Sequence, residues 1–348
     1  MIEIYCKNTG TKKSLKEGIT LLKLASEFEF DKPYDILAAK VNNVTEGIKY
    51  AVYNNKEVEF LDYRSYGGRN VYCRSLCFLL CKAAKDIFQK CKVVLRRPIS
   101  KGYYCLVDKG NGTELTADDV AAINARMQKI VSRNIPFYRH EVRISEAIEL
   151  FRKLGYDDKV KLLETCGDIY IGYYTLDGTA DFFYDALVPS SGYLHKWELS
   201  FFQNGMLLRV PNRHDPDALA PFIPQPKTFE VFSEMQKWNR IMKLDNAGDV
   251  NKACLEGKVS DLVQIAEDLQ EKKIDSGTAI GLVRAEADAA RVAAETAAYT
   301  NVMDGIATEH RNSFERQDIR KLESVTTVSQ GVDAVEHEMK GSSVNPSK

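Results

Sequence analysis

Apolar and polar positions along the first part of the chain predict short strands around one helix. Ile2, Ile4 and Cys6 alternate with polar residues, as the inward positions of a half-buried strand do. Thr20 is the expected N-cap of a helix with the apolar face Leu21, Leu22, Leu24, Ala25 and Phe28. Further strands are expected at 37–43, 50–53 and 58–61. A strand, a hairpin, a helix and more strands within about 60 residues predict a ubiquitin-like roll.

A longer apolar helix is expected at 71–88, where Cys73, Cys77 and Cys81 recur every four residues on one face. Such a cluster suggests a metal or redox centre. The alternative is core packing, because free cysteine behaves as a small buried apolar residue and the flanking leucine, phenylalanine and alanine residues make the helix apolar on most sides. We favour packing, since thiol zinc sites combine close cysteine pairs with a second ligand pair elsewhere.

Alternating helix and strand patterns continue to about residue 230. Thr116 and Asp119 form an expected capping box for a helix that ends near Val131, and Ser145 is the expected cap of a later helix. Strands are expected at 92–95, 99–105, 136–142, 169–176 and 205–210. The pattern predicts an α+β fold with helices on an antiparallel sheet.

Composition then divides the rest of the chain. The protein has 2 Trp, 17 Tyr and 15 Phe, and only Tyr299 and Phe314 lie beyond residue 274. A segment so poor in large apolar residues cannot easily build its own core. We therefore expect a ubiquitin-like domain at 1–62, a larger domain at 63–230, a helical connector at 231–274, and an alanine-rich helical or disordered tail at 275–348.

Net charge and cysteine content indicate the cellular compartment of the protein more than its function. The formal net charge of −1 gives no global attraction to polyanions, so any such site must be a local patch. The polar N-terminus is unlike a signal peptide, and no run of about 18 apolar residues predicts a membrane span. Eight scattered cysteines suit a reducing compartment. We expect a cytoplasmic protein with no membrane partner.

Several motifs occur in order along the chain: RSLCFLL, ISKGYYC, DDVAAINARMQKIV, AIELF, DKVKLLE, LVPSSGYL and GMLLRVPN. At matching spacing, they resemble bacterial nucleoside (uridine) kinases with an N-terminal extension, and this resemblance covers about residues 1–274. The extension itself resembles the TGS domain and the editing-type second additional domain of threonyl-tRNA synthetases. The resemblance implies the corresponding folds and a nucleotide- or tRNA-related role.

The synthetase resemblance also implies where an editing centre would lie. Its His-x-x-x-His pair falls on Arg74 and Phe78, its later cysteine on Phe183, and its last histidine on Leu187. Arginine, phenylalanine and leucine can neither hold zinc nor repeat that ester hydrolysis. We therefore expect no catalytic residue, no metal and no cofactor.

Three groups of residues could still bind a ligand. Lys101, Gly102, Tyr103 and Tyr104 combine a cation with two rings that could hold a phosphate and stack a base. Arg74 could bind a carboxylate or phosphate, and Ser190, Ser191 and Gly192 could bind an anion. Each has a structural alternative: the tyrosines alternate across a strand, Arg74 pairs with an acid such as Asp181, and Ser-Ser-Gly forms a turn.

The sequence lacks the phosphate-binding loop that a kinase of this family needs. Gly257-Lys258 is followed by Val259 and has no glycine five residues earlier, so G-x-x-x-x-G-K-[ST] is absent. The expected function is an inactive accessory, ligand-binding or regulatory region related to uridine kinase, with a nucleoside, a nucleotide or a kinase-domain chain as partner. One alternative is part of an active kinase that another chain completes. The other is a tRNA-related binding or editing-like protein, although the near-neutral net charge gives no support for RNA binding. Both an interrupted kinase gene and a fused segment would account for the tail.

Overall fold

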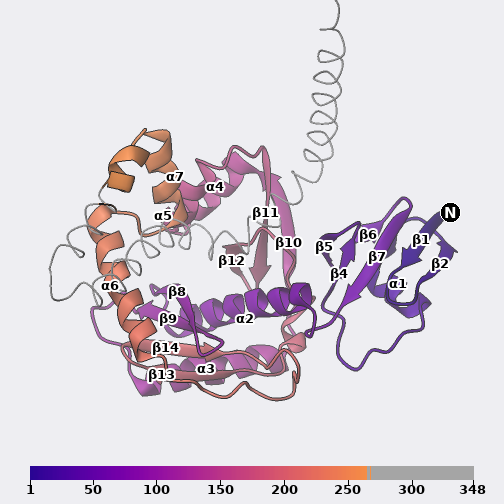
Figure 1. The fold of residues 1–348 in the computed structure, drawn as a ribbon, viewed down its shortest axis with the longest axis horizontal. Coiled ribbons are helices and arrows are strands. Elements are labelled where there is room, and N and C mark those ends of the chain that lie inside the picture. The colour runs from indigo at the N-terminus through magenta and orange to yellow at the C-terminus, as the bar shows by residue number, and fades with distance from the viewer. Residues whose placement is uncertain (265–266, 268–348) are drawn as a thin grey trace, which may run out of the picture.

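The computed structural model describes residues 1–264 and 267, and it confirms the mixed α+β class (Figure 1). The tail expected at 275–348 and the end of the expected connector lie outside the described residues. Two units are visible along the longest axis. The smaller, N-terminal unit is formed by β1 to β7 with α1, and the larger unit begins with α2.

The N-terminal unit is a five-stranded sheet covered by α1. The strand order is β2-β1-β7-β4-β5, with β1 and β7 parallel. Its strands are β1 (Ile2–Cys6), β2 (Thr11–Leu15), β4 (Ala38–Val41), β5 (Val44–Gly47) and β7 (Lys56–Leu61), and a separate pair joins β3 (Ile19–Thr20) to β6 (Ala51–Val52). Thr20 caps α1 (Leu21–Glu27) by accepting from the Lys23 backbone N–H, as predicted. The sequence pattern missed β5.

Helix α2 (Tyr66–Ile87) runs from the junction with the N-terminal unit into the larger unit (Figure 1). Ser65 caps it, and a Cβ on Gly68 would collide with the Asp62 carbonyl group, so only glycine fits this first turn. The helix is buried from Val71 to Ala84. It shares one core with α3 (Ala117–Ser132) and with residues of both sheets of the larger unit.

The larger unit also contains two antiparallel sheets. The four-stranded sheet has the order β13-β14-β9-β8, and the three-stranded sheet has the order β10-β11-β12. Their strands are β8 (Lys92–Ile99), β9 (Gly102–Asp108), β10 (Tyr138–Arg143), β11 (Tyr170–Leu176), β12 (Thr179–Phe182), β13 (Glu198–Phe202) and β14 (Gly205–Arg209). The sequence pattern missed β12 and β13.

One of two predicted helix N-caps in the larger unit is found in the structure. The capping box of Thr116 and Asp119 at the start of α3 is confirmed. The predicted cap at Ser145 is wrong. Helix α4 (Ile144–Lys153) already begins one residue earlier, and its N-cap, Arg143, makes no side-chain capping bond.

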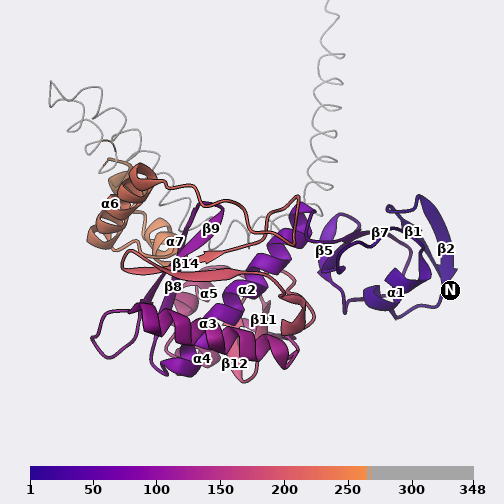
Figure 2. The same ribbon diagram turned by 90° about the horizontal axis from the view of Figure 1, so that it is seen from below.

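Three more helices lie towards the end opposite the N-terminal unit (Figure 2). Helix α6 (Pro226–Met242) places Phe229 against Tyr104, with ring centroids 5.2 Å apart, and so covers the outer face of the four-stranded sheet. Helix α7 (Ala247–Leu255) packs on α5 (Asp157–Leu163), where Lys161 and Asp249 form an ion pair at 2.6 Å. None of the described helices is long and apolar enough to cross a bilayer.

Candidate functional site

The four positions equated with an editing centre lie together in the core. Arg74 and Phe78 are one turn apart on α2, and Phe183 and Leu187 follow β12. The ring centroids of Phe78 and Phe183 are 5.2 Å apart. Phe78 is fully buried, and the other three side chains are at most 8% exposed. The chain therefore brings these positions together and fills the space between them with apolar groups.

Arg74 forms a buried ion pair in this core. Its Nη1 lies 3.1 Å from Oδ2 of Asp185, and its Nη2 donates to the Ala186 carbonyl at 3.3 Å. The side chains of Arg74 and Asp185 are 8% and 1% exposed. The structural alternative, in which Arg74 pairs with an acid, is confirmed, but the acid is Asp185 and not Asp181, whose carboxylate lies 3.0 Å from Lys159. The guanidinium of Arg74 thus already has an anion beside it.

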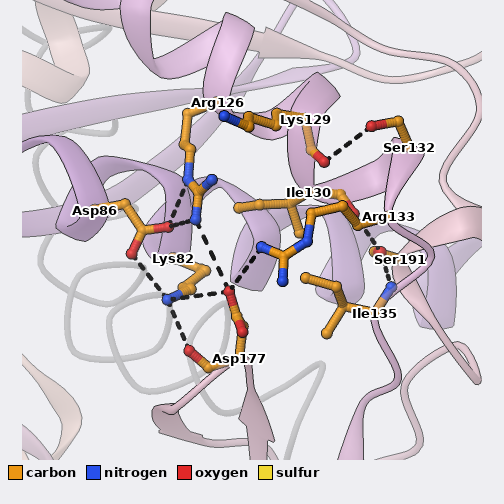
Figure 3. A network of polar contacts seen from close by, with 10 residues as sticks. All are labelled: Lys82, Asp86, Arg126, Lys129, Ile130, Ser132, Arg133, Ile135, Asp177 and Ser191. Atoms are coloured by element: carbon orange, nitrogen blue, oxygen red, sulfur yellow. Dashed lines mark hydrogen bonds and ion pairs between the residues drawn. The ribbon is translucent and has the colours of Figure 1, made fainter.

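The segment after β12 is fixed to α2 and to the end of α3. Ser75 Oγ donates to the Val71 carbonyl and accepts from the Val188 N–H at 2.9 Å. Ser191 Oγ donates to the Ile130 carbonyl and accepts from the Ile135 N–H, as Figure 3 shows. These bonds anchor the loop that carries Leu187.

Ser190 and Gly192, two of the predicted anion-binding residues, both bond to one neighbouring side chain. Ser190 Oγ donates to Asn134 Oδ1 at 2.6 Å, and the Gly192 N–H donates to the same oxygen at 3.1 Å. Together with Ser191, they form a turn held from within the protein. The arrangement fits the structural alternative for Ser190, Ser191 and Gly192 better than an open anion site.

The predicted group at Lys101 is a tight hairpin turn. Ser100 and Lys101 have φ of 49° and 60° between β8 and β9. Gly102 lies against β14, where a Cβ would come within 2.6 Å of the Leu208 carbonyl oxygen. Lys101 itself is exposed. Lys101 therefore forms part of a left-handed turn, and Gly102 allows β9 and β14 to approach closely.

Tyr103 and Tyr104 do not share a face of the sheet. Tyr103 packs with the α2 core, where the Cys73 thiol is the main cause of its raised pKa. Tyr104 faces α6, its hydroxyl bonds to Asn204, and burial raises its pKa to about 12. The alternation across the strand is confirmed, so the two rings cannot stack on one base.

The cysteines of α2 serve the core. Cys73, Cys77 and Cys81 are all buried, as the packing interpretation predicted, and Cys73 and Cys77 belong to this core. Burial raises the pKa of Cys81 to about 12, which keeps this thiol protonated at neutral pH. Within residues 1–264, no group of three or more His, Cys, Asp or Glu side chains is arranged to hold a metal.

A polar network joins α2, α3 and the β11–β12 turn next to this core (Figure 3). Lys82 Nζ donates to Asp86 and to the Asp177 carbonyl, both at 2.8 Å. Arg126 reaches the same Asp86 carboxylate at 2.6 Å, and Arg133 lies 3.6 Å from Asp177. Each of these five charged side chains lies beside one of opposite sign. We therefore interpret the network as one that holds α2, α3 and the β11–β12 turn together.

Comparison with known proteins points to one class of enzyme. No family model matches the chain. It is 29% identical over 195 residues to the threonine–tRNA ligase of Syntrophomonas wolfei, which is 56% of this chain and 30% of that protein. It is 29% identical over 200 residues to that of Desulforamulus reducens, covering 57% and 31%. It is 24% identical over 200 residues to that of Azobacteroides pseudotrichonymphae, covering 58% and 31%.

The chain is similar to part of the threonine–tRNA ligases. It spans about 30% of the length of these relatives. The synthetase part of the predicted resemblance is thereby supported. The predicted link to uridine kinases has no support in these matches, and neither does a kinase-domain partner.

Sequence reasoning missed a cleft between the two units. A cavity of about 730 Å³ is lined by the segment after α1, the start of α2 and two later loops, with Tyr34, Tyr63, Tyr72 and Tyr193 in its walls. Its residues are far apart in the sequence and carry no motif. Only the tyrosine content of these segments hinted at it.

Proposed function

We propose that this protein is a tRNA-related binding protein, built like the N-terminal region of a threonyl-tRNA synthetase but without editing hydrolysis. In this proposal residues 1–62 form a TGS domain, 63–230 an editing-type second additional domain, and 231–274 a helical connector. Its place of action is the cytoplasm, and its partner is an RNA or the nucleotide portion of one.

Two observations carry the proposal, one for binding and one against hydrolysis. The chain is similar over more than half its length to threonine–tRNA ligases. At the same time Phe78 and Phe183 pack ring against ring where the resemblance implies a histidine and a cysteine. A hydrolytic centre needs water, lone pairs and a polarised carbonyl. Phe78 and Phe183 supply neither a nucleophile nor a metal ligand at these positions, and the Arg74 guanidinium is already paired with Asp185.

A tRNA-related function is supported better than a kinase-related function. The relatives reported above are threonine–tRNA ligases, and the phosphate-binding loop is absent from the sequence. By contrast, the similarity to threonine–tRNA ligases extends to enzymes from several organisms. Similarity to part of a tRNA-handling enzyme supports binding, and the filled core argues against chemistry.

The experiment separates binding from hydrolysis on the full chain. A threonine tRNA carrying a non-cognate amino acid is incubated with the purified protein, and both retention of the tRNA and release of the amino acid are followed. We expect retention that weakens with salt, as phosphate contacts require, and release no faster than in buffer.

The matched control is a DNA duplex of equal charge in the same buffer. Equal retention of the duplex and the tRNA, or no retention of either at low salt, would contradict the proposal. Amino-acid release that scales with protein concentration and survives further purification would contradict the loss of editing chemistry.

A further inference from the structure

The cleft between the two units is large enough to hold a small ligand. Its volume of about 730 Å³ falls within the roughly 300–1,000 Å³ typical of small-molecule sites, which favour boundaries between domains. One wall comes from residues 32–37 after α1, and another comes from Tyr193, His195 and Lys196. A ligand placed here would touch both units. Phe78 and Phe183 do not line this cleft, although Tyr63 and Tyr72 in its walls belong to the same hydrophobic core as Phe78.

The floor of the cleft is aromatic and has no free hydroxyl. Tyr63 and Tyr72 meet edge to face, with centroids 4.9 Å apart and planes at 85°, and each is 4% exposed. Tyr63 donates to the Pro211 carbonyl at 2.9 Å. Tyr72 donates to the Lys196 carbonyl at 2.8 Å and accepts from the Lys196 N–H at 2.9 Å. What the floor offers a ligand is therefore ring carbon.

Two further rings stand higher in the cleft, one on each wall. Tyr34 and Tyr193 are both half-buried, so part of each ring stays open to a ligand. The Arg64 guanidinium lies 5.3 Å from the Tyr34 ring centroid, which limits where that ring can turn. Rings held in this way bind flat unsaturated groups by stacking, whichever base the group carries.

The rim carries charges of both signs. Lys32, Lys196 and His195 lie with Asp35 and Asp217, and His195 Nε2 is 2.8 Å from Asp35 Oδ2 across the cleft. With equal numbers of lysines and carboxylates, the rim does not favour a polyphosphate. It does supply donors and acceptors side by side, which match the edge of a base and the hydroxyls of a ribose.

We infer that this cleft binds a nucleoside, with the base on the tyrosine rings and the ribose at the charged rim. The nucleoside is either free or an unpaired residue of an RNA chain. The RNA source rests on the proposed function, whereas the free nucleoside does not. Occupation would bridge the N-terminal unit and the larger unit.

The test uses the full chain, four free nucleosides and a short single-stranded RNA as probes. Binding is measured by ligand-observed NMR for the nucleosides and by fluorescence anisotropy for the labelled RNA. Tyr34→Ala and Tyr193→Ala remove one open ring each. Tyr53→Ala is the matched control, because Tyr53 is a 68% exposed tyrosine of the N-terminal unit outside the cleft. Thermal unfolding of each variant verifies that it is folded.

We expect Tyr34→Ala and Tyr193→Ala each to weaken binding by about 5- to 100-fold, the range for loss of one stacked base, and Tyr53→Ala to leave it unchanged. Nucleoside binding that depends on these rings supports the cleft even where the RNA does not bind, which would defeat only the RNA function. RNA binding that all three variants retain overturns the cleft and leaves the function intact. Absence of binding by every probe at millimolar concentration also overturns the cleft.

Discussion

The ring of Phe78 on α2 lies 5.2 Å from the ring of Phe183 beyond β12, with their planes at 43°. Phe137 adds a third ring, 5.8 Å from Phe78. The contact with Phe183 joins a helix to a loop that is about a hundred residues away in the sequence. They make the region equated with an editing centre part of the hydrophobic core, so changes there should act on stability.

Truncating Phe78 should strongly destabilise the protein. Phe78→Ala removes a fully buried ring and leaves a cavity between α2 and the loop, which typically costs about 3–5 kcal/mol of unfolding free energy. Urea unfolding followed by circular dichroism measures the loss. The matched control is Phe201→Ala, because Phe201 on β13 is 42% exposed and its truncation should change stability by about 0.5 kcal/mol or less. A cost below about 1 kcal/mol for Phe78→Ala would contradict the filled core.

Replacing Arg74 alone should lower the unfolding free energy more than replacing both Arg74 and Asp185. Arg74→Met leaves the nearly buried Asp185 carboxylate without its cation, for a loss of about 3–5 kcal/mol. The double variant Arg74→Met, Asp185→Leu removes both charges and should regain most of that loss. A double-mutant cycle from urea unfolding gives the coupling energy. Additive effects of the two changes would mean that the pair is not coupled.

Local sequence signals predicted the elements of this fold well. The Thr20 cap, the Thr116–Asp119 capping box and the buried cysteines of α2 are all set by residues within a few turns of one another. Ser145 failed as a cap because α4 starts directly from the end of β10, with Arg143 in the capping position. Strands β12 and β13 were missed because each is short and partly apolar on both faces.

The site could be predicted only in part. Family resemblance located Arg74, Phe78, Phe183 and Leu187, but no sequence pattern shows that their side chains meet. The partner of Arg74 was misjudged because Asp181 and Asp185 are four residues apart, and only the path of the loop after β12 decides between them. The cleft escaped prediction because tertiary packing alone brings residues 32–37 against 193–196.

Alkaline pH should destabilise the protein through its buried thiols and phenols. Burial raises the pKa of Cys81 from 9.0 to about 12 and that of Tyr104 from 10.0 to about 12. Above about pH 9 the unfolded chain has therefore lost protons that the folded chain still holds, so the unfolding free energy falls as the pH rises. The loss continues until about pH 12, where the folded groups also ionise.

Urea midpoints measured between about pH 8 and about pH 11 test this dependence. Cys81→Ala and Tyr104→Phe should each flatten the decline, because each removes one group with a raised pKa. A Cys254→Ala variant is the control, since it removes a thiol that is exposed and not buried. An unchanged slope in both Cys81→Ala and Tyr104→Phe would contradict this explanation.

Replacing Lys101 by glycine should stabilise the β8–β9 hairpin. The turn places Lys101 at φ 60°, a left-handed conformation that side chains with a Cβ resist and glycine adopts freely. Lys101→Gly should therefore raise the unfolding free energy by roughly 0.5–1 kcal/mol, after the larger chain entropy of glycine is counted. Lys101→Ala is the control, because it removes the same charge and keeps the strained backbone. Equal stability of the two variants, measured by thermal and urea unfolding, would show that charge and not backbone conformation governs this turn.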